Sequence, residues 1–278
     1  MRTDFNGEQW TDDQGRPAGG VNYGTGFAIS WQNGPLGRDG ERKQPNGAFV
    51  ETILAVVASR IEFYNSGGFR CQENDDALTH IYAALEVSGV IRSRDGGETW
   101  RDISAPLIKL SEQPHLKSRL SSDTDASGML DSHAITVSAA APGNPFLAVR
   151  MGIFRSADRG DTWRDIEVGR HSPLTYCRNV MISPHDAKVM YACLSPASRS
   201  HDGSLYRSDD LGASWRRFDK GVKANATMMY TAVHPGDAAT VCCVSRCGQV
   251  FATADTGATW RESKLPPEVQ DVYTVACG

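Results

Sequence analysis

The amino-acid sequence predicts a mainly β fold, namely a β-propeller of four blades that follows a small α-containing N-terminal region. Three observations support this prediction. One eight-residue pattern occurs four times between Ser93 and Trp260. Segments that alternate apolar and polar residues surround the copies and supply four strands per repeat of about 45 residues, the size of a propeller blade. No such pattern occurs before Ser93, which separates the N-terminal region from the repeats.

The repeated pattern is Ser/Thr-x-Asp-x-Gly-x-Ser/Thr-Trp, and an Arg follows the Trp in every copy. The copies begin at Ser93, Ser156, Ser208 and Thr253, so they start 63, 52 and 45 residues apart. Asp can turn the chain by accepting bonds from nearby backbone N–H groups, and Gly takes the positive φ that the turn needs. Ser or Thr can bond the backbone across the turn, and Trp opens the next strand with a large apolar surface. The pattern therefore predicts a strand–turn–strand.

The pattern resembles the Asp box, or BNR repeat, of β-propellers of the sialidase, sortilin and WD40/YVTN-like superfamily, which includes photosystem II assembly factors and xyloglucanases. The resemblance covers about 200 residues, from 79 to 278. It implies that the box residues are structural and lie away from the ligand face. These residues are Ser93, Asp95, Gly97, Trp100, Ser156, Asp158, Gly160, Trp163, Ser208, Asp210, Gly212, Trp215, Thr253, Asp255, Gly257 and Trp260.

Two further strands are expected upstream of each of the last three boxes. Their predicted ranges are Ala134–Ala139 with Phe146–Arg150, Val180–Ser183 with Lys188–Leu194, and Met228–His234 with Thr240–Ser245. The first unit, Thr79–Ile103, supplies only three strands and lacks an innermost one. The last segment, Asp271–Gly278, has the pattern of an innermost strand and could complete the first blade. The alternatives are an incomplete propeller or a gap filled by the N-terminal region.

Residues 1–75 are expected to form a separate small α/β region, with the propeller spanning 76–278. Apolar residues within 48–64 recur at helical spacing, which predicts a helix there. Parts of this region resemble a phage domain with an α-helical hairpin, found in anti-CBASS and anti-Thoeris proteins that sequester cyclic nucleotides. The family's second helix should continue beyond Leu85, but here the chain enters the strand-like segment Gly89–Ser93. The residues that carry this resemblance are Trp31, Gly34, Pro35, Asn46, Gly47, Phe49, Glu51, Arg60, Phe63, Tyr64, Cys71, Glu73, Asn74, Ala77 and Leu78.

Composition excludes several classes of partner. The net charge is −4 and the pI near 6.0, so no basic excess indicates a nucleic-acid partner. No apolar run approaches the roughly 20 residues that span a bilayer, and the polar N-terminus lacks an apolar signal core. We therefore expect no membrane partner and a cytoplasmic location. The seven cysteines are irregularly spaced, so we expect no metal site. No Gly-rich phosphate loop appears, and we expect no cofactor.

Ligands of propellers usually meet loops at one rim of the central channel, and strand ends place several polar residues there. The rim candidates for ligand binding are Arg150, Arg178, Arg199, His201, Tyr230 and Arg246. Arg150, Arg178 and Arg246 invite comparison with the arginine cluster by which sialidases hold a carboxylate, because Arg pairs bidentately with carboxylates. The sialidase RIP signature is absent, and no Tyr–Glu nucleophile pair is identifiable. Glu86 and Asp131 are weak candidates for a catalytic acid/base pair.

Three functions remain open. The favoured one is a non-catalytic propeller that binds a protein or glycan at its rim, since fold alone does not imply an enzyme. The alternative is a sialidase-like glycoside hydrolase. The second alternative is a phage-type domain that sequesters cyclic nucleotides, fused to a propeller.

Overall fold

The computed structural model describes residues 3–4, 20–22, 28–30, 53–58, 80–85, 89–94, 99–116, 125–269 and 271–277. The chain forms two compact units, Met1–Glu51 and Thr52–Gly278. In the first unit, three short strands form an antiparallel sheet in the order β1-β3-β2. Their bounds are Thr3–Asp4 for β1, Gly20–Asn22 for β2 and Ala28–Ser30 for β3. All residues that carry the resemblance to the phage hairpin lie outside the described ranges.

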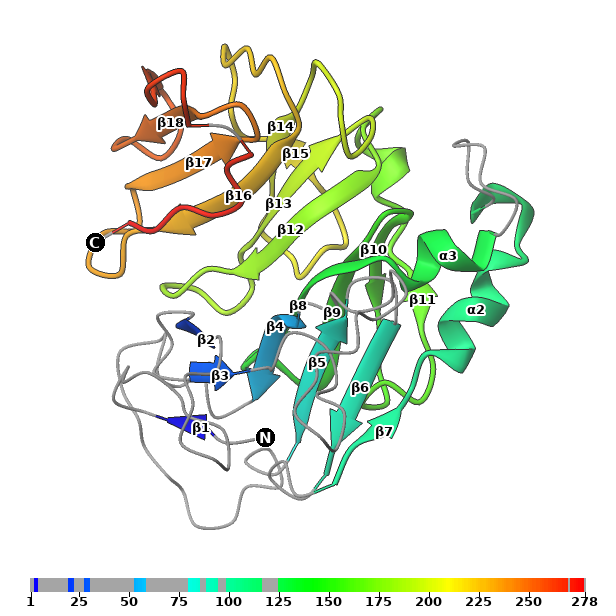
Figure 1. Cartoon of the computed structure of the whole chain (residues 1–278). Helices are drawn as coiled ribbons and strands as arrows, with labels where there is room; N and C mark the ends of the chain where they lie inside the picture. Colours follow the sequence, from blue (N-terminus) through cyan, green and yellow to red (C-terminus); the bar gives the residue numbers. More distant parts are fainter. Residues whose placement is uncertain are drawn as a thin grey trace. The chain divides into compact units, whose positions relative to one another are not determined.

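The second unit contains four antiparallel sheets of four strands each, which are the blades of a β-propeller (Figure 1). The first blade is β4 (Ile53–Ala58), β5 (Ile81–Leu85), β6 (Gly89–Ser93) and β7 (Arg101–Asp102). The second is β8 (Ser132–Ser138), β9 (Ala141–Val149), β10 (Gly152–Arg155) and β11 (Arg164–Asp165). The third is β12 (Tyr176–Ile182), β13 (Met190–Ser195), β14 (Ser204–Ser208) and β15 (Arg216–Arg217). The fourth is β16 (Met228–Val233), β17 (Val241–Ser245), β18 (Gln249–Thr253) and β19 (Arg261–Lys264).

Alternating side chains of the central strands join each blade to the next one along the chain. In β9, Leu147 and Val149 pack toward the first blade, whereas Phe146 and Ala148 pack toward the third. A strand buried on both faces needs such a continuous apolar run rather than a polar face. Three apolar clusters thus join the blades in chain order, and among the described residues none joins the fourth blade to the first.

The boxes whose turns the structure describes share one geometry, which confirms the predicted strand–turn–strand. In the second blade, the N–H of Gly160 donates to Ser156 Oγ at 2.7 Å. Thr162 donates to Asp158 from its N–H at 2.7 Å and from its hydroxyl at 2.6 Å. The third and fourth boxes repeat these bonds around Asp210 and Asp255. In the first box, Asp95 and Gly97 lie outside the described residues.

The prediction of a helix at 48–64 is wrong over Ile53–Ala58, which form the strand β4. This strand pairs antiparallel with β5, with Val57 opposite Tyr82, and supplies the innermost strand that the first blade lacked. The sequence Ile-Leu-Ala-Val-Val-Ala is a short apolar run, and periodicity alone cannot distinguish a helix from a buried strand in such a run. The structural boundary accordingly follows Glu51 rather than residue 75.

The predicted C-terminal strand is also not formed, because residues 271–277 carry no strand. The inner edge of the first blade is already occupied by β4, so the segment cannot complete that sheet. Asp271 instead adopts a positive φ of 55°, and the N–H of Val272 donates to the carbonyl of Arg246 at 3.0 Å. The segment therefore contacts the fourth blade. In the second blade, a turn at Ala139–Ala140 joins β8 to β9, so β9 begins earlier than the predicted Phe146.

The connection between the first two blades is helical. It contains α2 (Ala105–Ser111), the 3-10 turn η2 (Pro114–Leu116) and α3 (Asp125–Leu130). Leu107, Leu116 and Met129 are buried in the cluster between the first and second blades. None of the described helices is long and apolar enough to cross a membrane.

Candidate functional site

The innermost strand of every blade has an irregular register near its first residues. Pairing skips one residue in each strand, and the skipped residues are Leu54 in β4, His133 in β8, Arg178 in β12 and Met229 in β16. A β-bulge redirects a side chain and is common beside functional sites. In the second and third blades the redirected residues are polar. Five residues at this end of the second and third blades are called the rim cluster below: Asp131, His133, Arg150, Tyr176 and Arg178.

Asp131 is the central acceptor of the rim cluster. Its Oδ2 accepts from Arg150 Nε at 3.1 Å, and its Oδ1 lies 3.3 Å from His133 Nε2. Burial would raise the pKa of the Asp131 carboxyl, but hydrogen bonding and charge from His133, with the charges of Arg150 and Arg178, lower it below its usual value. Asp131 is therefore an anion at neutral pH.

His133 is fully buried and joins the second blade to the third. Its Nδ1 lies 2.6 Å from the carbonyl oxygen of Cys177, which can only accept, so this nitrogen carries a proton. Its Nε2 faces both Asp131 and the hydroxyl of Tyr176, which is 3.3 Å away. Burial raises the pKa of Tyr176 against the opposing charge of Arg178, so its hydroxyl stays protonated and can donate. The ring is thus locked between two blades.

Arg178 and Arg246 both contact the ring of Tyr273. Their guanidinium carbons lie 5.8 and 5.7 Å from the ring centre, within the range of cation–π attraction. Arg246 Nε also donates to Asp271 at 2.6 Å, and this bond raises the pKa of Arg246. Among the described residues, no carboxylate forms an ion pair with Arg178. The sequence did not indicate Asp271 or Tyr273 as site residues, because their segment was expected to form the innermost strand of the first blade.

The other rim candidates are less closely connected. Arg199 and His201 are exposed on the loop between β13 and β14, and Arg246 contacts that loop through the carbonyl of Ser198 at 3.2 Å. Tyr230 lies in β16 opposite Val244 and is 36% exposed. Glu86 lies outside the described residues, so the acid/base pair with Asp131 stays a prediction. Within the described ranges, no group of three or more His, Cys, Asp or Glu residues is placed to hold a metal ion.

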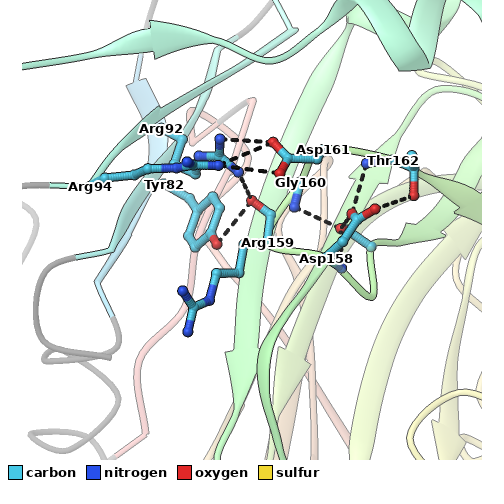
Figure 2. A network of polar contacts seen from close by, with 9 residues as sticks. Tyr82, Arg92, Arg94, Asp158, Arg159, Gly160, Asp161 and Thr162 are labelled. Atoms are coloured by element: carbon cyan, nitrogen blue, oxygen red, sulfur yellow. Dashed lines mark hydrogen bonds and ion pairs between the residues drawn. The ribbon is translucent and has the colours of Figure 1, made fainter. Parts of the chain in front are cut away.

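A second polar network joins the first blade to the box of the second, and Figure 2 shows it. Arg92, whose side chain is 1% exposed, donates to Asp161 at 2.9 Å and contacts the carbonyl of Arg159. The hydroxyl of Tyr82 donates to the same carbonyl at 3.1 Å, and burial raises the pKa of this hydroxyl to about 12. Arg94 forms an exposed pair with Asp161. Because these bonds join residues of two blades, we interpret the network as a structural link between blades.

Comparisons with known proteins find similarity over parts of the chain. No family model matches the sequence. The xyloglucanase Xgh74A of Acetivibrio thermocellus is 26% identical over 151 residues, which are 52% of this chain and 17% of that protein. The GH74 xyloglucanase structure from Xanthomonas campestris has a TM-score of 0.49 at 14% identity. The match covers 66% of this chain and 28% of that one. YCF48 bound to the D1 peptide has a TM-score of 0.44 at 16% identity, covering 69% and 51%. The chain thus spans about a sixth of the length of its curated relative.

Proposed function

We propose that this propeller is a non-catalytic binding protein whose rim holds an acidic group of a protein or glycan partner. The observation that carries the proposal is the excess of arginine at the rim. Arg150 pairs with Asp131, while Arg178 is half-buried beside it and forms no ion pair with any described carboxylate. A guanidinium offers a planar set of donors that matches a carboxylate, and it is more weakly hydrated than an ammonium group.

The protonation state of Asp131 supports a binding role over a catalytic one. A glycosidase needs one carboxyl group with a raised pKa, which can donate a proton to the leaving group. The pKa of Asp131 is lowered, because His133 and two arginines outweigh the effect of burial. Asp131 therefore cannot serve as the general acid at neutral pH.

A panel of sialylated glycans, uronic-acid glycans and acidic peptides tests the proposal. We expect the full chain to bind at least one acidic class in a salt-dependent manner, and Arg178→Ala to weaken that binding at least tenfold. Arg261→Ala is the matched control, because Arg261 is exposed on β19 and far along the chain from the rim cluster. Binding to no acidic compound, or equal affinity in Arg178→Ala, would contradict the proposal.

A glycoside hydrolase is the second candidate, and the similarity to xyloglucanase Xgh74A favours it. In that case Asp131, as an anion, would act as the base or nucleophile and a second carboxyl group would supply the proton. Incubation with xyloglucan and with sialyl-oligosaccharides, followed by an assay for new reducing ends, tests this candidate. Product that disappears in Asp131→Asn supports it. If no more product forms than in a heat-denatured sample, the glycoside hydrolase candidate is excluded.

A further inference from the structure

The segment Asp271–Tyr273 is bound at the rim mainly through one residue, Arg246. The carbonyl of Arg246 accepts from the N–H of Val272 at 3.0 Å. Its Nε donates to Asp271 at 2.6 Å, and a terminal nitrogen lies 3.4 Å from the Tyr273 hydroxyl. Arg246 therefore contacts three consecutive residues, by one main-chain bond and two side-chain contacts. This combination is typical of peptide recognition, in which backbone bonds add affinity and side-chain sites add specificity.

Arg178 of the third blade completes the contact on Tyr273. Two guanidinium groups from different blades lie within 6 Å of the centre of the same ring. A terminal nitrogen of Arg246 also donates to the carbonyl of Ser198 at 3.2 Å, so a contact outside the segment helps to hold its guanidinium. The blades thus provide a site with one place for a carboxylate and one for an aromatic ring.

The segment Asp271–Tyr273 is held less firmly than the arginines that bind it. The side chain of Asp271 is 54% exposed, and Tyr273 is 51% exposed. Ion pairs that remain in water are weak, because solvent screens them and the side chains lose freedom. Asp271 also takes a positive φ of 55°, which costs a non-glycine residue some conformational energy. A ligand with the same groups could therefore displace the segment.

We propose that the rim site binds peptides in which an acidic residue is followed two positions later by an aromatic one, and that Asp271–Tyr273 occupies the site as an internal competitor. The inference rests on the proposed binding function and gives its ligand class. Arg246 receives the carboxylate and one backbone N–H, and Arg178 and Arg246 together receive the ring. A resident competitor lowers the apparent affinity for an external peptide in proportion to its occupancy.

Fluorescence anisotropy with a labelled, end-capped peptide Asp-Val-Tyr-Thr-Val tests the proposal in the full chain. We expect the double variant Asp271→Asn/Tyr273→Ala to bind this peptide about tenfold or more tightly than the unaltered chain, if the segment occupies the site at least about 90% of the time. Adding Arg246→Ala should weaken that binding at least tenfold, whereas adding Arg261→Ala should leave it unchanged. A control peptide, Asn-Val-Ala-Thr-Val, should not bind.

A second measurement does not depend on the release variants. Saturating peptide should speed hydrogen exchange at the Val272 amide of the unaltered chain, because displacement breaks its bond to Arg246. Equal peptide affinity in the double variant and the unaltered chain, with unchanged exchange at Val272, overturns the inference. If acidic glycans still bind in an Arg178-dependent manner, the proposed function survives that result. If nothing acidic binds, both fail.

Discussion

Arg92 donates from a buried guanidinium to the carboxylate of Asp161 at 2.9 Å, and this bond connects the first blade to the turn of the second. The two residues lie 69 positions apart. Arg92 also contacts the carbonyl of Arg159, to which Tyr82 donates (Figure 2). One charged side chain thus donates to both a carboxylate and a backbone carbonyl.

Arg92→Ala should lower the free energy of unfolding by about 3 kcal/mol, because the change removes a buried partner and its packing. Arg94→Ala is the control, since Arg94 pairs with the same Asp161 but both side chains are 55% exposed. That change should cost less than about 1 kcal/mol. Urea denaturation measures both values, and similar losses in the two variants would show that the buried contacts add nothing.

Gly160→Ala and Gly221→Ala separate backbone strain from steric overlap. Both glycines have positive φ, 94° and 86° respectively. A Cβ at Gly160 would lie 2.5 Å from Ile103 Cδ1, whereas nothing lies within 4 Å of one at Gly221. We expect Gly221→Ala to cost about 1–2 kcal/mol from the left-handed conformation alone. Gly160→Ala should cost about 3 kcal/mol, since overlap in a packed interface adds a further 1–3 kcal/mol. Thermal and urea unfolding measure the stability loss of each variant. A larger loss for Gly221→Ala than for Gly160→Ala would contradict the packing described between the first two blades.

Asp131→Asn should lower the free energy of unfolding by about 2 kcal/mol at pH 7, because Arg150 and His133 lose a largely buried anionic acceptor. Asp209→Asn is the comparison: Asp209 also accepts from two arginines, but its side chain is 50% exposed. It should cost less than about 1 kcal/mol. An Asp131 effect no larger than the Asp209 effect would mean that the rim cluster is not preorganised.

Asp255 should make the protein lose stability in acid. Hydrogen bonds from the side chain and backbone of Thr259, and from Thr253, lower the pKa of Asp255 from 3.8 to about 2. Since the folded pKa is depressed, the stability from Asp255 is present above pH 3.8 and is lost as the pH falls from 3.8 through about 2. The unfolding free energies of Asp255→Asn and the unaltered chain should therefore differ more at pH 5 than at pH 2. A difference that does not depend on pH would refute this role.

Much of the propeller could be predicted from the sequence, because its strongest signals are local. The bonds from Gly160 to Ser156 and from Thr162 to Asp158 each span four residues, so an eight-residue pattern contains the whole turn. The sequence predicted Asp131, Arg150 and Arg178 near the ends of strands, and the structure brings the three close together. Whether they bind a ligand stays a prediction.

Two elements were predicted wrongly because their state depends on distant pairing. Ile53–Ala58 could be helix or strand by its apolar pattern, and pairing with β5 makes it a strand. Asp271–Cys277 has a strand pattern, but the inner edge of the first blade is not free to pair with it, since β4 already occupies that edge. A local pattern carries no information about which edge is free.

By itself, therefore, the sequence determined the repeat, the box turns and the four-stranded blades, because local bonds and alternating apolar residues produce them. The tertiary structure alone decided which strand completes the first blade, how Arg92 reaches Asp161, and how Arg178 and Arg246 meet at Tyr273. Those relations join residues that lie far apart in the sequence. They depend on bulges and on inter-blade packing, which bring together side chains whose spacing in the sequence follows no period.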